Sequence, residues 1–419
     1  MTLLTDLAGR ATRAPRLADA AARSLASLHV LDTLGCVAAG ATHPLTSVLP
    51  ALGAPGGSGT LTVTGLPGRH PLRTAVLVES VLAHVDEFDA LHPAAAVVPP
   101  AVTVPAALAV AEQEGLSGRA VVDAVLAGYE TVVEAGLRFG GPRLYERSWW
   151  PTALFGALGA AAATASLLDL DERRTAHALA IAAAGLGGLL GSDALGLGHY
   201  LLAGRAAADG VEAAYLARAG ATGSLALLDS PATAALGTAP TDPREAALHL
   251  TTCVFKAYPC ARPLHAALDA LQAVDIPLST ARRIEIELPD SLLRFVTADR
   301  NPPGPTEAAA SAAFAVGALL SGAPDDVTFF RGPLPPDVPD VALLPAPDLN
   351  GALPDRWSAR VTVHTGSVVI RRTCDQATPP TADAVIAKSR RRLGDAFIER
   401  CLALDDLPRA DVVRRLVPY

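Results

Sequence analysis

Long alanine- and leucine-rich segments, interrupted by single glycines or prolines, fill most of residues 17–219. Alternating runs of β-branched residues, which are typical of half-buried strands, are very few in this stretch. The pattern therefore predicts that helices dominate the first half of the protein. With 419 residues, of which 50% are apolar and 18% charged, the chain is long enough to bury a large core and to form two domains.

Several helices in this half can be placed from their apolar spacing and their boundary residues. The segments expected to be helical are 25–39, 119–139, 172–184 and 201–219. Ser117 and Asp171 are placed to cap the second and third of these, and Gly220 is placed to end the fourth. The glycine-rich interval 185–188 predicts a loop beside a site.

After Pro263 the sequence changes character. Isoleucine and leucine alternate with glutamate over residues 284–288, as in a half-buried strand, and two further apolar runs flank a short turn, as in a hairpin. The expected elements are strands at 284–288, 359–363 and 368–372, helices at 306–320 and 381–402, and a proline-rich surface segment at 332–354. Together these elements predict an α+β module.

The expected fold class is therefore mainly α, with a large all-helical domain followed by a smaller α+β domain. We place the helical domain at residues 1–262 and the α+β domain at residues 263–394. The last helices, at about 395–419, are expected to complete the helical domain. No repeat of fixed period is present, so a solenoid is not expected despite the helical bias.

The charge distribution limits the partners of the protein. The formal net charge is -8 and the arginines are scattered rather than gathered into a stripe, so no nucleic-acid partner is expected. The longest nearly uncharged stretches, 153–168 and 179–192, are shorter than the roughly 18–20 apolar residues that span a bilayer, so no membrane partner is expected. A small-molecule substrate is the partner that remains.

The compartment is predicted from the cysteines and the N-terminal segment. The five cysteines are widely spread, with no C-x-x-C spacing for zinc or redox chemistry, and we interpret them as reduced thiols. Residues 1–17 contain Asp6 and three arginines where a signal peptide would need an uninterrupted apolar segment. We therefore expect the protein in the cytoplasm.

The segment 84–92 gathers three acids and two histidines into nine positions of an otherwise apolar chain. Proton abstraction beside a carboxylate needs a base with a pKa near neutrality, and an imidazole oriented by a carboxylate supplies one. His92 is the leading candidate for this base, with Asp89 or Glu87 as its orienting partner.

Two other interpretations of this segment stay open. It could be a solvated acidic loop that contains a structural histidine. It could also hold a metal ion through His84, Asp86 and His92, although this irregular spacing is not a ligand signature.

Lys256 and Lys388 are the only two lysines among the 34 lysines and arginines of the chain. Arginine fills every other one of these 34 positions. A lysine at such a position therefore indicates a need for a compact charge or a titratable amine. Lys256 could bind a substrate carboxylate or stabilise an enolate. It could also be a chance survivor on the surface.

Arg262 and His265 follow Lys256 within nine residues, at the start of a helix expected near residue 263. Because a helix N-terminus favours an anion, both side chains could bind an anionic group in a cleft. Arg262 could equally form an ordinary interdomain salt bridge. Cys260, in the same turn, is interpreted as a packing residue rather than a nucleophile.

Five segments, which follow one another in order, carry a family resemblance. They are Leu31-Asp32-Thr33-Leu34-Gly35-Cys36 with Ala39-Gly40, the acidic loop from His84 to Pro100, Trp150-Pro151-Thr152 with Gly156, Leu202-Ala203-Gly204-Arg205-Ala206-Ala207 with Gly220 and Gly223, and Lys256-Ala257-Tyr258-Pro259-Cys260-Ala261-Arg262 with His265. Together they span more than half of the chain, and their order and spacing resemble the MmgE/PrpD family. That family contains the cofactor-free lyases and isomerases that include 2-methylcitrate dehydratase and cis-aconitate decarboxylase.

The resemblance implies a homodimer whose active site lies in a cleft between the helical domain and the smaller domain, which would serve as a lid. It also implies that the enzyme uses no metal and no organic cofactor.

Several positions depart from the pattern of the family, and each change removes polarity or alters charge. Trp150 stands where a histidine is usual, and His199 stands where a lysine is usual. Phe314 replaces a tyrosine, and Leu91 replaces a threonine. A site for a citrate-like tricarboxylate needs several cations and donors to replace water. Trp150, Leu91 and Phe314, together with Trp149, instead predict a pocket for a larger and less charged substrate.

The leading hypothesis is a cofactor-independent lyase or isomerase, with specialised metabolism as one setting. His92 would remove a proton beside a carbonyl or carboxylate, and Lys256 and Arg262 would stabilise the enolate. His199 or an acid of the loop would then return a proton or expel a leaving group, unless His199 is only a helix-capping residue. Dehydration, decarboxylation, isomerisation, epimerisation and cyclisation all fit this scheme.

The residues expected to bind the substrate are Arg262, Trp150, Trp149, Leu91, Phe314, His265 and Asp86. Two alternatives to the leading hypothesis stay open. One is a non-catalytic ligand-binding scaffold that lost its catalytic set, which the departures from the family pattern motivate. The other is an authentic 2-methylcitrate dehydratase with compensating residues elsewhere.

Overall fold

The computed structural model describes residues 1–52, 59–190, 196–234, 236–237 and 248–414. Residues 415–419, which end the expected C-terminal helices, lie outside the described residues. Within the described part the protein is mainly α, as expected, and it contains two small sheets. No helix in this part is long and apolar enough to cross a membrane.

The helices and strands follow one another along the chain with short 3-10 turns between them. The α-helices are α1 (Leu3–Leu17), α2 (Ala20–Gly40), α3 (Leu72–His84), α4 (Pro99–Glu114), α5 (Gly118–Arg138), α6 (Arg143–Glu146), α7 (Pro151–Leu167), α8 (Glu172–Ala183), α9 (Leu197–Arg218), α10 (Pro231–Ala234), α11 (His265–Gln272), α12 (Pro305–Ala308), α13 (Ala312–Leu320), α14 (Ala382–Arg390), α15 (Asp395–Leu402) and α16 (Asp411–Arg414). The strands are β1 (Leu61–Val63), β2 (Leu66–His70), β3 (Arg283–Leu288), β4 (Asp340–Pro345), β5 (Ala359–His364) and β6 (Val369–Cys374).

One apolar core joins α1–α9 with the hairpin of β1 and β2, and we call residues 1–255 the helical part. α7 lies at its centre against α4, α5 and α9, and nearly all of its residues are buried. Small residues allow this close packing. A Cβ atom on Gly128 of α5 would lie only 2.9 Å from the backbone oxygen of Gly159 in α7, so this contact requires glycine.

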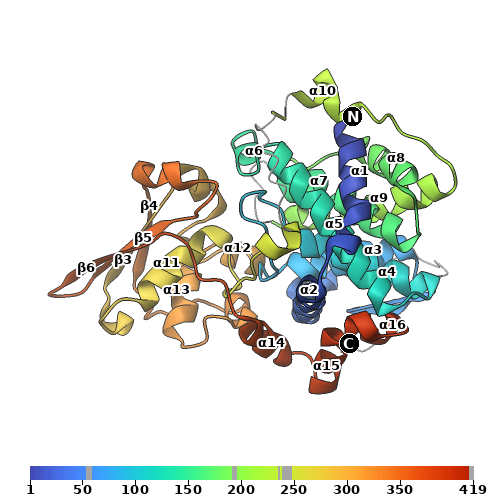
Figure 1. Ribbon diagram of the computed structural model, residues 1–419. Coiled ribbons are helices and arrows are strands. Elements are labelled where there is room, and N and C mark those ends of the chain that lie inside the picture. Colours follow the sequence, from blue (N-terminus) through green and yellow to red (C-terminus); the bar gives the residue numbers. More distant parts are fainter. Residues whose placement is uncertain (53–58, 191–195, 235, 238–247, 415–419) are drawn as a thin grey trace.

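A four-stranded sheet organises residues 258–377, which we call the sheet part, in the order β4-β3-β5-β6. β3 pairs parallel with β4 and antiparallel with β5, and β5 pairs antiparallel with β6. Ile284, Ile286 and Leu288 alternate along β3 and are buried in a second apolar core with residues of α11 and α13. Figure 1 shows this sheet to one side of the helical part.

After the sheet part the chain returns to the helical part. α14 packs on α2, and apolar residues of α14, α15 and α16 join the first core. Figure 1 shows these three helices, in red, along the lower edge of the molecule beside the blue α2. α14 lies within residues 263–394, which were expected to form the α+β domain. It nevertheless packs with the helical part, because Val385 is buried in the first core. The division into two domains at residue 262 stays a prediction.

The expected helix caps are confirmed. Ser117 Oγ accepts a hydrogen bond from the Ala120 amide at 3.3 Å, and Asp171 Oδ1 accepts one from the Arg174 amide at 2.8 Å. The expected hairpin is formed by β5 and β6, and the segment 185–188 lies outside any helix, as expected.

Two expected helices are each broken into shorter pieces. The helix expected at 306–320 forms α12 and α13, because Ser311 caps α13 and the Ala312 amide donates to the Thr297 carbonyl at 2.7 Å. The helix expected at 381–402 forms α14 and α15, which begin separately after Thr381 and Gly394.

Two structures were not expected from the sequence. The proline-rich segment 332–354 contains β4, whose pairing partner β3 lies far away along the chain. The half that was expected to be all-helical contains the hairpin of β1 and β2, in which Leu61 and Val63 are buried against the first core.

Candidate active site

A pocket of about 550 Å³, including its open mouth, lies where the helical part meets the sheet part. Phe295 and Trp357 line it from the sheet part, and residues 261–263 line it at the junction. The complete lining is His84, Glu87, Leu91, Val98, Tyr145, Trp150, Leu190, His199, Lys256, Ala261, Arg262, Pro263, Phe295 and Trp357. Titratable side chains and aromatic rings therefore line one pocket, as in many enzyme active sites.

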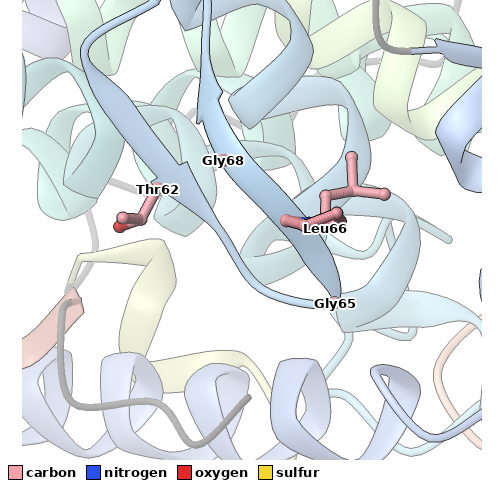
Figure 2. A pocket seen from close by; sticks show the side chains of 5 residues that line it. Thr62, Gly65, Leu66 and Gly68 are labelled. Carbon is pink, nitrogen blue, oxygen red and sulfur yellow. The ribbon is translucent and has the colours of Figure 1, made fainter.

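A larger hollow, of about 850 Å³ with its open solvent, lies at the hairpin of β1 and β2. Figure 2 shows Thr62 and Leu66 on the two strands, with Gly65 in the turn between them. Its lining residues are Thr62, Gly65, Leu66, Pro67 and Gly68, none of which is titratable. Proton chemistry therefore points to the smaller pocket in spite of the size of this hollow.

His84 ends α3 and is the best-oriented imidazole of the pocket. Its Nδ1 donates a hydrogen bond to Asp89 Oδ1 at 2.9 Å, which leaves Nε2 as the lone-pair nitrogen of the neutral ring. Among the described residues Nε2 has no hydrogen-bond partner, and it lies 3.5 Å from Glu87 Oε1. Burial alone would lower the pKa of His84, but the charges of Asp89 and Glu87 outweigh it and raise the pKa.

Glu87 connects the charged groups of the pocket. Lys256 Nζ donates to Glu87 Oε2 at 2.7 Å and to the Glu87 backbone oxygen at 2.8 Å, and Tyr200 donates to Oε1 at 3.3 Å. Burial would raise the pKa of Glu87, but Lys256, His84 and His199 together lower it to about 2. Glu87 also has a left-handed φ of 51°, a strained conformation that these contacts hold in place.

His199 lies in the first turn of α9 and stacks on Trp150, with ring centres 3.7 Å apart. Its ring centre is 5.8 Å from that of His84. Burial, and then the charge of His84, lower the pKa of His199 to about 3, so this imidazole is neutral near pH 7. Two neighbouring titratable groups whose pKa values are pushed apart are typical of a site for proton transfer.

Arg262 lines the pocket, and His265 lies behind it. Arg262 Nη1 donates to His265 Nδ1 at 3.3 Å, because His265 Nε2 already donates to the Cys260 carbonyl at 3.2 Å. Both side chains are buried. The structure therefore places the expected binding pair together, with Arg262 in the pocket wall and His265 orienting it.

His92 does not line this pocket. Its Nε2 donates to Thr252 Oγ1 and its Nδ1 accepts from the Ala95 amide, both at 3.0 Å, so neither ring nitrogen is open to a substrate. Burial lowers the pKa of His92 to about 3. The two acids expected to orient it, Asp89 and Glu87, contact His84 instead.

Besides His265, three expected substrate-binding residues lie outside the pocket lining, whereas Leu91, Trp150 and Arg262 belong to it. Asp86 is buried in an ion pair with Arg331, at 2.9 Å. Phe314 packs among aromatic residues of the second core. Trp149 is half-buried and pairs with Leu189 through the backbone.

The pocket also contains residues for which the sequence predicted no catalytic or substrate-binding role. His84 belonged to the acidic cluster, and its position five residues before Asp89 was the signal that could have identified it. Tyr145, Phe295 and Trp357 had no such signal, because they reach the pocket from segments far from that cluster.

The site contains one set of side chains with the spacing of metal ligands. Among the described residues, donor atoms of His84, Glu87 and His199 all lie within 4.8 Å of one another. This set shares only His84 with the triad considered from the sequence. The Lys256 ammonium, 2.7 Å from Glu87 Oε2, would repel a cation at that carboxylate. The donor set therefore does not suit a metal ion while Lys256 is in place.

Comparisons with known proteins agree with the resemblance. The family model of the MmgE/PrpD N-terminal domain matches residues 9–245, which is more than half of the chain. The cis-aconitate decarboxylase-like protein oryM of Aspergillus oryzae (strain ATCC 42149 / RIB 40) is 30% identical over 178 residues. That match covers 41% of this chain but only 37% of the relative. The protein therefore belongs to the MmgE/PrpD family.

Proposed function

We propose that the protein is a cofactor-independent lyase or isomerase that removes a proton from a carbon beside a carbonyl or carboxylate group. The observation that carries this proposal is the His84 imidazole. Asp89 orients it through Nδ1, and its Nε2 has no hydrogen-bond partner among the described residues of the pocket wall. A general base needs this geometry. The family, and a relative named for its likeness to a decarboxylase, support a lyase.

The proposed reaction begins when neutral His84 Nε2 takes the proton as the substrate C–H bond breaks. The electron pair moves to the adjacent carbonyl oxygen, and the charges of Arg262 and Lys256 in the pocket wall stabilise the resulting enolate. The imidazolium of His84 then returns its proton to carbon, or gives it to a leaving group as that bond breaks. We assign a second proton transfer to His199, which is neutral near pH 7 and whose ring centre is 5.8 Å from that of His84.

This scheme assigns to His84 the base role that the sequence suggested for His92. Both ring nitrogens of His92 are bonded within the protein, whereas His84 lines the pocket. The roles of Lys256, Arg262 and His199 are kept from the sequence. We also propose that the protein works in the cytoplasm as a homodimer, for which light scattering should give twice the chain mass of 42.8 kDa.

Exchange of substrate hydrogen with solvent tests the proposal directly. Candidate carboxylic acids and keto acids are incubated with the protein in deuterated buffer, and the products are examined by mass spectrometry and proton NMR. We expect deuterium at a carbon beside the carbonyl or carboxylate of the true substrate. Binding of an acid without exchange or product would instead support the ligand-binding scaffold. Loss of water from 2-methylcitrate would support an authentic 2-methylcitrate dehydratase.

The pH dependence of turnover should report the His84–Asp89 pair. A base must be unprotonated, and the raised pKa of His84 means that turnover rises with pH, with a midpoint above the ordinary value of about 6.5. Asp89→Asn removes the charge that raises this pKa, so the midpoint should move to lower pH. The profile of kcat/KM for both proteins checks this. An unchanged midpoint in Asp89→Asn would show that His84 does not control the rising limb.

A further inference from the structure

The charges of the pocket wall almost cancel in pairs. Lys256 Nζ lies 2.7 Å from Glu87 Oε2. His84 is paired with Asp89 when it is protonated, with Nδ1 2.9 Å from Oδ1, and adds no charge to the wall when it is neutral. Burial is the main cause that lowers the pKa of His199 to about 3. His199 therefore adds no charge near pH 7. These pairs leave one cation of the lining without an opposite charge.

Arg262 is that cation. Its side chain is 7% exposed. Among the described residues no carboxylate oxygen lies within 4.0 Å of the Arg262 guanidinium nitrogens, and Arg262 Nε has no hydrogen-bond acceptor. The charge of Asp269 acts on Arg262. However, the Asp269 carboxylate accepts hydrogen bonds from Tyr258 at 2.6 Å and from the Thr378 amide at 2.8 Å.

An unpaired guanidinium inside a protein is costly, because burial removes its water without supplying an anion. Burial lowers the pKa of Arg262 to about 10, so the group is still charged near pH 7. His265 fixes its direction, because the lone pair of His265 Nδ1 accepts from Arg262 Nη1 at 3.3 Å. A fixed cation in a pocket wall is suited to receive one anionic group.

The rest of the wall suits neutral groups. Leu91, Val98, Leu190 and Phe295 are apolar, and Trp150 presents an aromatic ring. Trp357 is also buried, and within the described part of the chain its Nε1 has no acceptor. An indole N–H donates but cannot accept, so it suits an uncharged oxygen of a ligand.

We propose that the substrate carries a single carboxylate, bound by Arg262, on an otherwise uncharged and largely apolar body. This inference rests on the proposed function and names the class of substrate for the same site. A second or third carboxylate would approach Glu87, where like charges repel, or would lose its water against apolar side chains. Tricarboxylates of the citrate kind are therefore the class that this wall rejects.

Ligands that differ in their number of carboxylates test whether the pocket binds one carboxylate. Binding of cinnamate and hex-2-enoate, of their primary amides, and of citrate is measured by calorimetry with the full-length protein. We expect each acid to bind about tenfold or more tightly than its amide, because hydrogen bonds to charged groups are the stronger ones, and citrate to bind more weakly than either acid. In Arg262→Gln the preference for acid over amide should disappear. In the control Arg372→Gln, which changes a half-buried arginine of β6 paired with Asp275, the preference should persist.

Equal binding of acid and amide, tightest binding of citrate, or no binding of either acid would overturn the proposal. A second measurement does not depend on these probes: because Arg262 is buried and unpaired, Arg262→Gln should unfold at an equal or higher temperature than the parent protein. A lower unfolding temperature would show that the contacts of Arg262, such as its bond to His265, outweigh the cost of burying its charge, which would contradict a costly unpaired cation. Deuterium exchange without a preference for acids would keep the proposed function and remove only this inference. A preference for acids without deuterium exchange would keep this inference and remove the proposed function.

Discussion

Replacing Lys388 with methionine is expected to lower the free energy of unfolding by about 3–5 kcal/mol, the range for breaking a buried ion pair from one side. Lys388 Nζ lies 2.7 Å from Asp32 Oδ1 and donates to the Phe88 backbone oxygen at 2.5 Å. Lys388 is 7% exposed and Asp32 is 1% exposed. Burial would lower the pKa of Lys388, but Asp32 outweighs it and raises the pKa, so the ammonium form is the one present. Burial raises the pKa of Asp32 even beside Lys388, so without that ammonium Asp32 is a buried carboxyl group that has lost its cation.

Urea unfolding followed by circular dichroism measures this effect. Arg390→Met is the matched control, because Arg390 is also on α14 but its pair with Asp395 is on the surface. Its cost should stay within about 1 kcal/mol. The double variant Asp32→Asn with Lys388→Met should lose less stability than the sum of the two single variants, because both act on one interaction. A loss for Lys388→Met no larger than that of the control would contradict the pairing.

The two lysines of the chain hold neighbouring residues of one segment. Lys256 donates to the Glu87 backbone oxygen and Lys388 donates to the Phe88 backbone oxygen. One lysine follows the helical core, and the other comes from a helix near the C-terminus. These bonds constrain the turn that gives Glu87 its left-handed φ and carries Asp89 back to His84. The rarity of lysine in the sequence suggested a functional role for Lys256, but the same argument applies equally to Lys388.

The fold was predictable where local chemistry decides it. Ser117 and Asp171 begin helices because their side chains accept hydrogen bonds from backbone amides of the first turn. The period-two pattern at Ile284 and Ile286 forms a strand because one face of it is buried. β4 could not be found in the same way, because its pairing with β3 joins segments that are distant in the sequence.

The candidate site was predictable only in part. The acidic cluster gave the correct segment, but two histidines and three acids allow several pairings, and only the backbone turn at Glu87 decides that Asp89 contacts His84. Trp357 joins the pocket because the sheet part packs against the helical part, which no local pattern describes. Phe314 was selected from the family pattern, but its side chain lies in the second core.

His84→Gln is expected to lower kcat by about 10²–10⁴-fold, the range for losing a general base. Glutamine keeps a polar side chain at the end of α3 but cannot accept a proton, so folding should be retained while proton abstraction is lost. The loss should appear in both turnover and deuterium exchange, measured on the acid that the exchange assay identifies. Circular dichroism establishes whether the variant keeps the parent fold.

His92→Gln is the comparison that separates the two histidines of the acidic segment. His92 is bonded through both ring nitrogens and lies outside the pocket lining, so its loss should reduce kcat by less than about tenfold, well below the range for a lost base. A reversed order, with His92→Gln inactive and His84→Gln active, would return the base role to His92. It would also mean that the Thr252 and Ala95 bonds open when substrate binds, because only then could either nitrogen of His92 reach a proton on carbon.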